Sequence, residues 1–160
     1  AYLYQGEELG LQEVAEIPDA DRQDPTFFRN KGVEIGRDGC RVPLPWTAGG
    51  PSFGFGDGGA HLPQPAWFSR YAVAAEDGVE GSTLEFYRKA LKLRRELQTS
   101  EELQWHQAGP GVLHFSRPGG WQTVTNFGDE PVELPAGEVL LSSGPLDGDL
   151  LPGSTTVWLR

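Results

Sequence analysis

The sequence predicts an α/β segment followed by a small all-β domain, because three patterns follow one another along the chain. The first is AYLY, a short apolar run at residues 1–4 that is typical of a strand buried on both faces. The second is an amphipathic helical pattern that begins near residue 82. The third is a series of short β-rich runs beyond residue 98, separated by turn sequences.

Between the first strand and the helix, residues 11–81 show almost no hydrophobic periodicity. This segment includes the glycine- and proline-rich stretch WTAGGPSFGFGDGGAHLPQP. A loop of this length is uncommon in a compact domain unless it has a function. We expect an elaborated connection with short helical turns near DPTFFR and PAWFSRYAVAAE.

The helix has a clear start signal in the S-x-x-E capping box formed by Ser82 and Glu85. Apolar residues then recur at helical spacing and predict one buried face, namely Phe86, Ala90, Leu93 and Leu97. Basic residues occupy the other side, which we interpret as a solvated face that also complements the helix dipole.

Four runs after the helix predict the strands of an antiparallel β-domain: VLHF, WQTVTNF, EVLLSS and TTVWLR. The turn compositions RPGG, GDEP and GPLDGD separate them. About sixty residues are few for an independently stable domain, so we expect this module to pack against its neighbour.

The charge balance excludes some classes of partner. The chain has a net charge of -10 and a pI near 4.7, so its surface repels phosphate groups, and we expect neither nucleic acid nor an anionic membrane as a partner. No apolar run approaches the length of a membrane span, and no signal peptide is visible. The sequence has no Met and opens on AYLYQGEELG, which indicates a start inside a larger protein.

A single cysteine, Cys40, excludes an internal disulfide and a cysteine-based metal cluster. We interpret it as a small packed residue and not as a catalytic nucleophile, because no histidine lies near it in sequence. The lack of disulfides favours a cytoplasmic location. No calcium-loop spacing of acidic residues is present, so we expect no metal and no cofactor.

Residues 36–46, GRDGCRVPLPW, predict a rigid charged loop. The two prolines fix their φ angles and remove two N–H groups, which excludes a regular helix or an alternating strand. Arg37, Asp38 and Arg41 lie within five positions of one another. The charged side chains of such a loop either form hydrogen bonds and ion pairs within the loop or bind a ligand.

Together these motifs resemble the C-terminal part of exo-acting α-glucosidases, in the oligo-1,6-glucosidase-like branch of the α-amylase family of glycoside hydrolases. The resemblance covers essentially the whole chain. The motifs that carry it are YQGEELG, DPTFFR, GRDGCRVPLPW, FGF, LPQPAWF, TLEFYRKALKLRREL and the tail NFGDEPVELPAGEVLLSSG with TTVWLR.

The resemblance implies the last strand, loop and helix of a (β/α)8 TIM barrel, followed by a small antiparallel β-sandwich. Residues 1–102 are then the C-terminal part of the catalytic barrel, with the eighth strand at residues 1–5, a long substrate loop and the eighth helix. Residues 103–160 are the C-terminal β-sandwich domain.

The implied activity is the release of terminal α-linked glucose from maltose, sucrose or short oligosaccharides by a retaining double displacement. In this family the catalytic carboxylates lie on earlier barrel strands, so the resemblance implies no catalytic residue within this chain and no activity of these residues alone. The implied partners are the sugar substrate and the N-terminal portion of the same barrel. A glucosyl isomerase or transferase of the trehalose synthase type and a non-catalytic barrel scaffold are the alternatives.

The resemblance assigns substrate binding to the charged loop. It implies that Arg41 contacts the terminal glucose and pairs with an Asp from an early barrel loop; the alternative is an arginine that locks the loop onto the barrel. Arg37 and Asp38 are further candidate substrate contacts, with an internal Arg–Asp brace as the simpler interpretation. Gly39-Cys40 and Val42 depart from the oligo-1,6-glucosidase form of the loop, so the linkage preference stays open.

Other polar and aromatic residues have both a structural and a functional interpretation. Glu7 and Glu8 point to opposite faces of an extended strand, which makes them a poor acid–nucleophile pair and favours structural support. His61 can reach a substrate from the loop, whereas His106 and His114 fall in or near the β-domain and are expected to be structural. The loop aromatics either stack on sugar faces or pack under the loop; these are Trp46, Phe53, Phe55 and Trp67.

Overall fold

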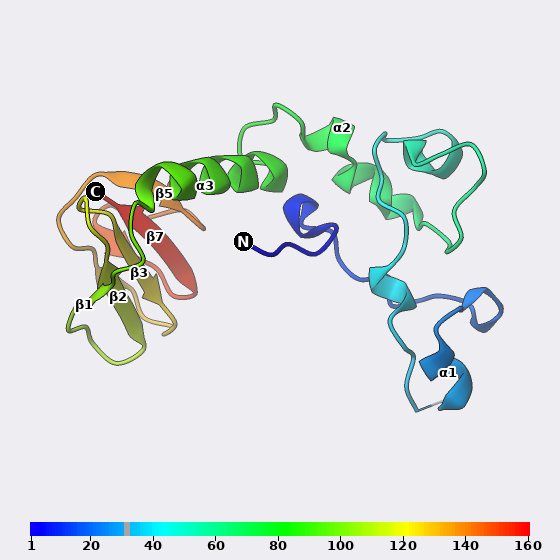
Figure 1. Ribbon diagram of the computed structural model, residues 1–160, viewed down its shortest axis with the longest axis horizontal. Helices are drawn as coiled ribbons and strands as arrows, with labels where there is room; N and C mark the ends of the chain where they lie inside the picture. Colours follow the sequence, from blue (N-terminus) through cyan, green and yellow to red (C-terminus); the bar gives the residue numbers. More distant parts are fainter. Residues whose placement is uncertain (31–32) are drawn as a thin grey trace. The chain divides into compact units, whose positions relative to one another are not determined.

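The computed structural model describes residues 1–30 and 33–160. Its contacts divide the chain into two compact units, Ala1–Lys89 and Ala90–Arg160. Figure 1 shows the loop-rich first unit in blue to green and the strands of the second unit in yellow-green to red. The predicted helix is α3, Thr83–Leu97, and the boundary between the two units falls within it.

The first unit has no β-strand among its described residues. Residues 1–5, predicted as a strand, have no hydrogen-bonded strand partner. A strand is stabilised by the backbone of a neighbouring strand, so an apolar run by itself does not form one. Glu7 and Glu8, expected on an extended strand, lie in the 3-10 turn η1 at Glu7–Leu9, so the structure corrects that expectation. The strand at residues 1–5 stays a prediction, because its expected partners are strands of the remainder of the barrel.

The long connection contains short helical elements, as predicted. The two expected regions are α1 at Pro25–Arg29 and the successive elements η5 at Ala66–Tyr71 and α2 at Val73–Glu76. Three further 3-10 turns are η2 at Asp19–Asp21, η3 at Asp38–Cys40 and η4 at Pro51–Gly54. None of these short elements is long enough to be stable alone, so their positions depend on packing.

That packing comes from a hydrophobic cluster within the connection itself. Its buried members are Val14, Ile17, Val42, Leu62 and Phe68. Burying one such side chain contributes about 1.5–3 kcal/mol, so the cluster fixes the path of a segment with little regular structure. Phe53 and Trp67 pack against the cluster, under the loop, while Trp46 and Phe55 are half-exposed.

Helix α3 begins with the predicted serine cap, but the second cap partner is a different residue. The Ser82 hydroxyl accepts a hydrogen bond from the Glu85 N–H at 3.3 Å. The Glu85 carboxylate accepts from the Gly78 N–H and does not return to Ser82. The buried Glu76 carboxylate accepts from the Leu84 N–H at 2.9 Å and so satisfies another donor of the first helical turn.

The second unit is an antiparallel β-domain, as predicted. The four predicted strands are β2 (Val112–Ser116), β3 (Gln122–Asn126), β5 (Val139–Ser142) and β7 (Thr155–Leu159). Three two-residue strands join them: β1 (Gln104–Trp105), β4 (Val132–Glu133) and β6 (Leu150–Leu151). One sheet has the order β1-β2-β3-β7-β5, and β4 pairs with β6 in a second sheet.

The core of the second unit is made by residues from both sheets. Val124 of β3, Leu151 of β6, and Val157 and Leu159 of β7 pack together and are at most 2 % exposed. Val124 lies directly opposite Val157 in the ladder, so the two side chains share one face of the five-stranded sheet. Two sheets that share a core in this way form the predicted sandwich.

Candidate functional site

The charged loop at residues 36–46 is attached to the segment before α1 by the carboxylate of its own residue Asp38. Asp38 is 2 % exposed, and its Oδ2 accepts hydrogen bonds from the N–H groups of Gln23 and Asp24 at 2.9 and 3.0 Å. Such charge-assisted bonds offset the cost of burying a carboxylate. The brace predicted between Arg37 and Asp38 is thus a brace between Asp38 and the backbone that precedes α1.

Asp24 is a second buried carboxylate, and it points from α1 back to the loop. Its Oδ1 caps α1 by accepting from the Thr26 N–H at 2.8 Å. Its Oδ2 accepts from the Arg37 N–H at 2.8 Å and from Arg41 Nη1 at 2.9 Å. The hydrogen bonds from Thr26 and Arg37, with the charge of Arg41, outweigh the effect of burial and lower the pKa of Asp24 to about 2. The carboxylate is therefore ionised near neutral pH.

Two glycines allow the loop to approach its support. Gly39 is buried, and a Cβ at that position would collide with the carbonyl oxygen of Val14. The same contact includes a hydrogen bond from the Val14 N–H to the Gly39 carbonyl at 3.1 Å. Gly36 has a φ of +74°, and a Cβ there would lie 2.7 Å from the Cβ of Asp24. The first and fourth residues of GRDG are therefore glycine for reasons of space, and at Gly36 also of conformation.

Arg41 is anchored at one guanidinium nitrogen, and its side chain is partly exposed. Its side chain is 44 % exposed, against 6 % for that of Asp24. Among the described residues, Asp24 is the one hydrogen-bond partner shown for the Arg41 side chain. The guanidinium has five N–H donors in a planar fork, so an anchored Nη1 leaves donors for hydroxyl groups of a ligand. Asp24 is a partner from within the chain, and the pairing with an Asp of an early barrel loop that the resemblance implies stays a prediction.

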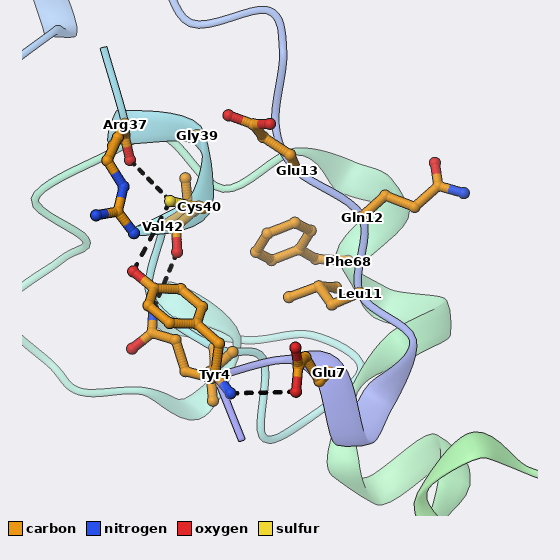
Figure 2. Close-up of a pocket in the computed structure, with 12 residues that line it drawn as sticks. Tyr4, Glu7, Leu11, Gln12, Glu13, Arg37, Gly39, Cys40, Val42 and Phe68 are labelled. Carbon is orange, nitrogen blue, oxygen red and sulfur yellow. Dashed lines mark hydrogen bonds between the residues drawn. The ribbon is translucent and has the colours of Figure 1, made fainter. Parts of the chain in front are cut away.

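Arg37 lines a cavity of about 360 Å³ between the N-terminal segment and the charged loop, shown in Figure 2. Its guanidinium carbon lies 5.9 Å from the centre of the Tyr4 ring. The neighbouring Cys40 side chain, and to a smaller extent that of Tyr4, raises the pKa of Arg37. Cys40 Sγ donates to the Arg37 carbonyl at 3.2 Å, and Leu11 and Phe68 contribute an apolar part of the wall.

The structure separates the three predicted substrate contacts. Arg37 lines the cavity, Arg41 is exposed outside its lining, and Asp38 is buried behind the loop. The sequence did not point to Asp24 as a site residue. A signal was present in DPT, because an Asp followed by Pro is typical of a helix N-cap, but the pattern does not reveal which loop the carboxylate contacts.

Glu7 and Glu8 bond to the backbone of their own turn. Glu7 Oε2 accepts from the Tyr4 N–H at 3.2 Å, and Glu8 Oε2 accepts from the Gly6 N–H at 3.0 Å. These contacts stabilise η1 and agree with the predicted structural role. Each carboxylate thus has a backbone partner.

Two of the three histidines have side-chain partners in the β-domain. The rings of His106 and His114 lie in contact in the β-domain, with their centroids 4.4 Å apart and their planes tilted by 33°. His106 Nε2 lies 2.8 Å from Ser116 Oγ, and His114 Nε2 lies 2.9 Å from Gln122 Oε1, in agreement with a structural role. His61 is exposed, and its carbonyl accepts from a side-chain amide of the loop.

The part of the chain that the structure describes has neither a metal-binding cluster nor a membrane-spanning helix. No group of three or more His, Cys, Asp or Glu side chains there is arranged to hold a metal ion. Within the same residues, no helix has the length and apolar character needed to cross a membrane. Cys40 is a free thiol of intermediate exposure.

Comparison with known protein families gives two matches. Residues 1–102 match the family described as "Alpha amylase, catalytic domain", which covers more than half of the chain. Residues 108–158 match a family described as "Domain of unknown function (DUF3459)". The two matches follow each other along the chain without overlap.

Two curated proteins are similar in sequence. A protein of Rhizobium meliloti (strain 1021) named "Probable alpha-glucosidase" is 35% identical over 140 residues, which cover 83% of this chain and 25% of that protein. A protein of Bacillus subtilis (strain 168) named "Probable oligo-1,6-glucosidase 2" is 30% identical over 112 residues, which cover 59% of this chain and 20% of that protein. The chain thus spans a quarter or less of the length of these relatives.

Two solved structures have a similar fold. The crystal structure of XgtA, described as an alpha-glucosyl transfer enzyme, has a TM-score of 0.75 and 34% identity over 99% of this chain and 32% of that one. The trehalose-6-phosphate hydrolase of Bacillus licheniformis has a TM-score of 0.72 and 20% identity over 98% of this chain and 35% of that one. The first likeness extends to the sequence, and the second shows the fold alone.

Proposed function

The chain belongs to the α-amylase family, and from this membership we propose that it forms part of an α-glucosidase-like glycoside hydrolase. The proposed reaction releases terminal α-linked glucose from maltose, sucrose or a short oligosaccharide by a retaining double displacement. The names of the two curated relatives and of XgtA support this substrate class. The observation that carries the proposal is Arg41, whose guanidinium is anchored at Nη1 to Asp24 while its side chain is 44 % exposed.

In this proposal the charged loop binds the sugar. Arg41 donates to hydroxyl groups of the terminal glucose with the N–H groups that Asp24 does not use. Arg37 contributes a second cation, which lines the cavity next to the charged loop. Asp38, also a candidate contact in the sequence, is 2 % exposed, so we assign it to holding the loop and not to the sugar.

We place the two catalytic carboxylates in parts of the enzyme outside residues 1–160. A retaining mechanism needs a pair of carboxyl groups about 5–5.5 Å apart on either side of the scissile bond. Glu7 and Glu8 are engaged by their own turn. Asp24 and Asp38 are buried and hold backbone N–H groups. Residues 1–160 alone are therefore expected to be inactive.

The proposed protein partner is the remainder of the same barrel. Tyr2 is fully exposed, and Leu3 and Tyr4 are 46 % and 43 % exposed. An apolar run at residues 1–4 that is exposed in this way fits a strand that pairs with neighbouring barrel strands and is covered on both faces.

Product analysis of the complete enzyme tests the proposed reaction. Maltose, sucrose and isomaltose are supplied separately, and proton NMR follows the first product. We expect α-glucose to be released before mutarotation, because a double displacement retains the configuration. β-Glucose as the first product would refute the retaining mechanism, and a complete enzyme without turnover would favour the scaffold alternative. Residues 1–160 alone serve as the inactive control.

A glucosyl transferase or isomerase is the second candidate function, favoured by the 34% identity to a glucosyl transfer enzyme. Such an enzyme passes the glucosyl unit to a sugar hydroxyl instead of water. The same NMR experiment decides between the two functions. Transfer from maltose yields new disaccharide or oligosaccharide signals and one free glucose, the leaving group, for each glucosyl unit transferred, and isomerisation yields a new disaccharide with little free glucose. Hydrolysis yields two glucose molecules for each maltose consumed and no new glycosidic signals.

A further inference from the structure

We propose that Asp24 is a positioning residue for Arg41: it fixes the guanidinium in the orientation that binds the terminal glucose. This inference rests on the proposed function and adds a residue to the same site. The two residues are 17 positions apart, and the Nη1–Oδ2 distance is 2.9 Å. Asp24 itself is buried, so it acts on the sugar through Arg41.

The Asp24 carboxylate is fixed by bonds that do not involve Arg41. Thr26 N–H holds its Oδ1, and Arg37 N–H holds its Oδ2, each at 2.8 Å. Its own backbone N–H is bound by the buried carboxylate of Asp38 at 3.0 Å. Arg41 therefore meets an acceptor whose place is already set by the backbone around it.

The Arg41 side chain needs such an anchor. At 44 % exposure it has little packing to limit its rotamers, and a long arginine side chain loses rotamer freedom when it is ordered. A fixed ionic hydrogen bond orders the side chain before the substrate arrives. Preorganised donors of this kind increase the rate of a bound reaction, because the ordering is not repeated in each turnover.

A double-mutant cycle on the complete enzyme with maltose tests the coupling. Asp24→Asn retains one oxygen for the Thr26 N–H but replaces an acceptor with an NH2 group at the position that binds Arg41. We expect kcat/KM to fall at least about tenfold in the parent enzyme, and less than about twofold further in the Arg41→Ala background. Equal losses in both backgrounds would indicate a merely structural role and would overturn the inference, as would unchanged kinetics of Asp24→Asn.

Asp77→Asn is the matched control. Asp77 also pairs with an arginine, Arg88, but lies outside the charged loop. We expect the kcat/KM of this variant to equal that of the parent. A loss as large as that of Asp24→Asn would show a general effect of charge and would overturn the inference.

A crystal structure of the unaltered enzyme with bound glucose tests the same point without depending on the folding of a variant. We expect Arg41 Nη1 to stay within about 3 Å of Asp24 while another guanidinium nitrogen contacts a sugar hydroxyl. An Arg41 that leaves Asp24 to reach the sugar would overturn the inference and leave the proposed function intact. A complete enzyme that does not act on α-glucosides would refute both.

Discussion

The Oδ2 atom of Asp38 lies 3.0 Å from the backbone nitrogen of Asp24, so one buried acidic residue holds the segment that carries another. Asp24 returns the contact by accepting from the Arg37 N–H at 2.8 Å. Each of the two segments, residues 23–24 and residues 37–38, thus offers a side-chain carboxylate to a backbone N–H group of the other. The charged loop is fixed by this buried polar brace and by the apolar cluster beneath it.

Replacing Asp38 by Ala should lower the free energy of unfolding by about 1–3 kcal/mol, because the N–H groups of Gln23 and Asp24 would lose their acceptor inside the fold. Asp38→Asn keeps one acceptor oxygen and should lose less. Urea unfolding followed by tryptophan fluorescence measures both variants. An Asp38→Ala variant as stable as the parent would contradict the brace.

Asp24 should make the fold sensitive to acid in a defined range. Its pKa is lowered to about 2 in the folded chain, chiefly by the hydrogen bonds from Thr26 and Arg37, against about 3.9 in an unfolded chain. A lowered folded pKa means that the stabilising contribution is complete above about pH 4 and is lost as the pH falls through about 2. Thermal unfolding from pH 7 to pH 2 should therefore show a smaller acid loss in Asp24→Asn. If the melting temperatures of the parent and of Asp24→Asn fell equally with pH, the lowered pKa of Asp24 would not contribute to the acid sensitivity.

Gly39→Ala should destabilise the loop by about 1–3 kcal/mol, because the new methyl group would overlap the Val14 carbonyl and force the loop away from its support. The matched control is Gly49→Ala. A Cβ at Gly49 has no neighbour within 4 Å, so the control should change stability by no more than about 0.5 kcal/mol. Equal unfolding midpoints for the two variants would show that Gly39 has no packing role.

Arg41→Ala in the complete enzyme should lower kcat/KM on maltose by about 100-fold or more, because charged hydrogen bonds to the sugar are lost. Its unfolding midpoint should fall only slightly, since the side chain is 44 % exposed. The exposed Arg70 provides the control variant, Arg70→Ala, which should keep the parent kinetics. Unchanged kinetics in Arg41→Ala would remove this residue from the substrate site.

Sequence patterns within short stretches of the chain predicted much of the fold. The capping serine and the helical spacing of apolar residues located α3, and β-rich runs between turn sequences located β2, β3, β5 and β7. These elements follow from local backbone preference and from a periodic apolar face, both of which can be read from a short window of sequence. Strands β1, β4 and β6 have two residues each, which is too short for any period to be visible.

The sequence by itself determined the family, the order of the elements and the place of the charged loop, because those depend on motifs and spacing along the chain. Only the tertiary structure decided that Asp24 anchors Arg41, that Asp38 is buried, and that Glu76 supports the start of α3. It also decided that residues 1–5 have no strand partner within the described residues of this chain. The physical reason is the same in these cases. The function of a carboxylate or of a strand depends on its hydrogen-bond partners, and folding brings those partners together from positions that are distant in the sequence.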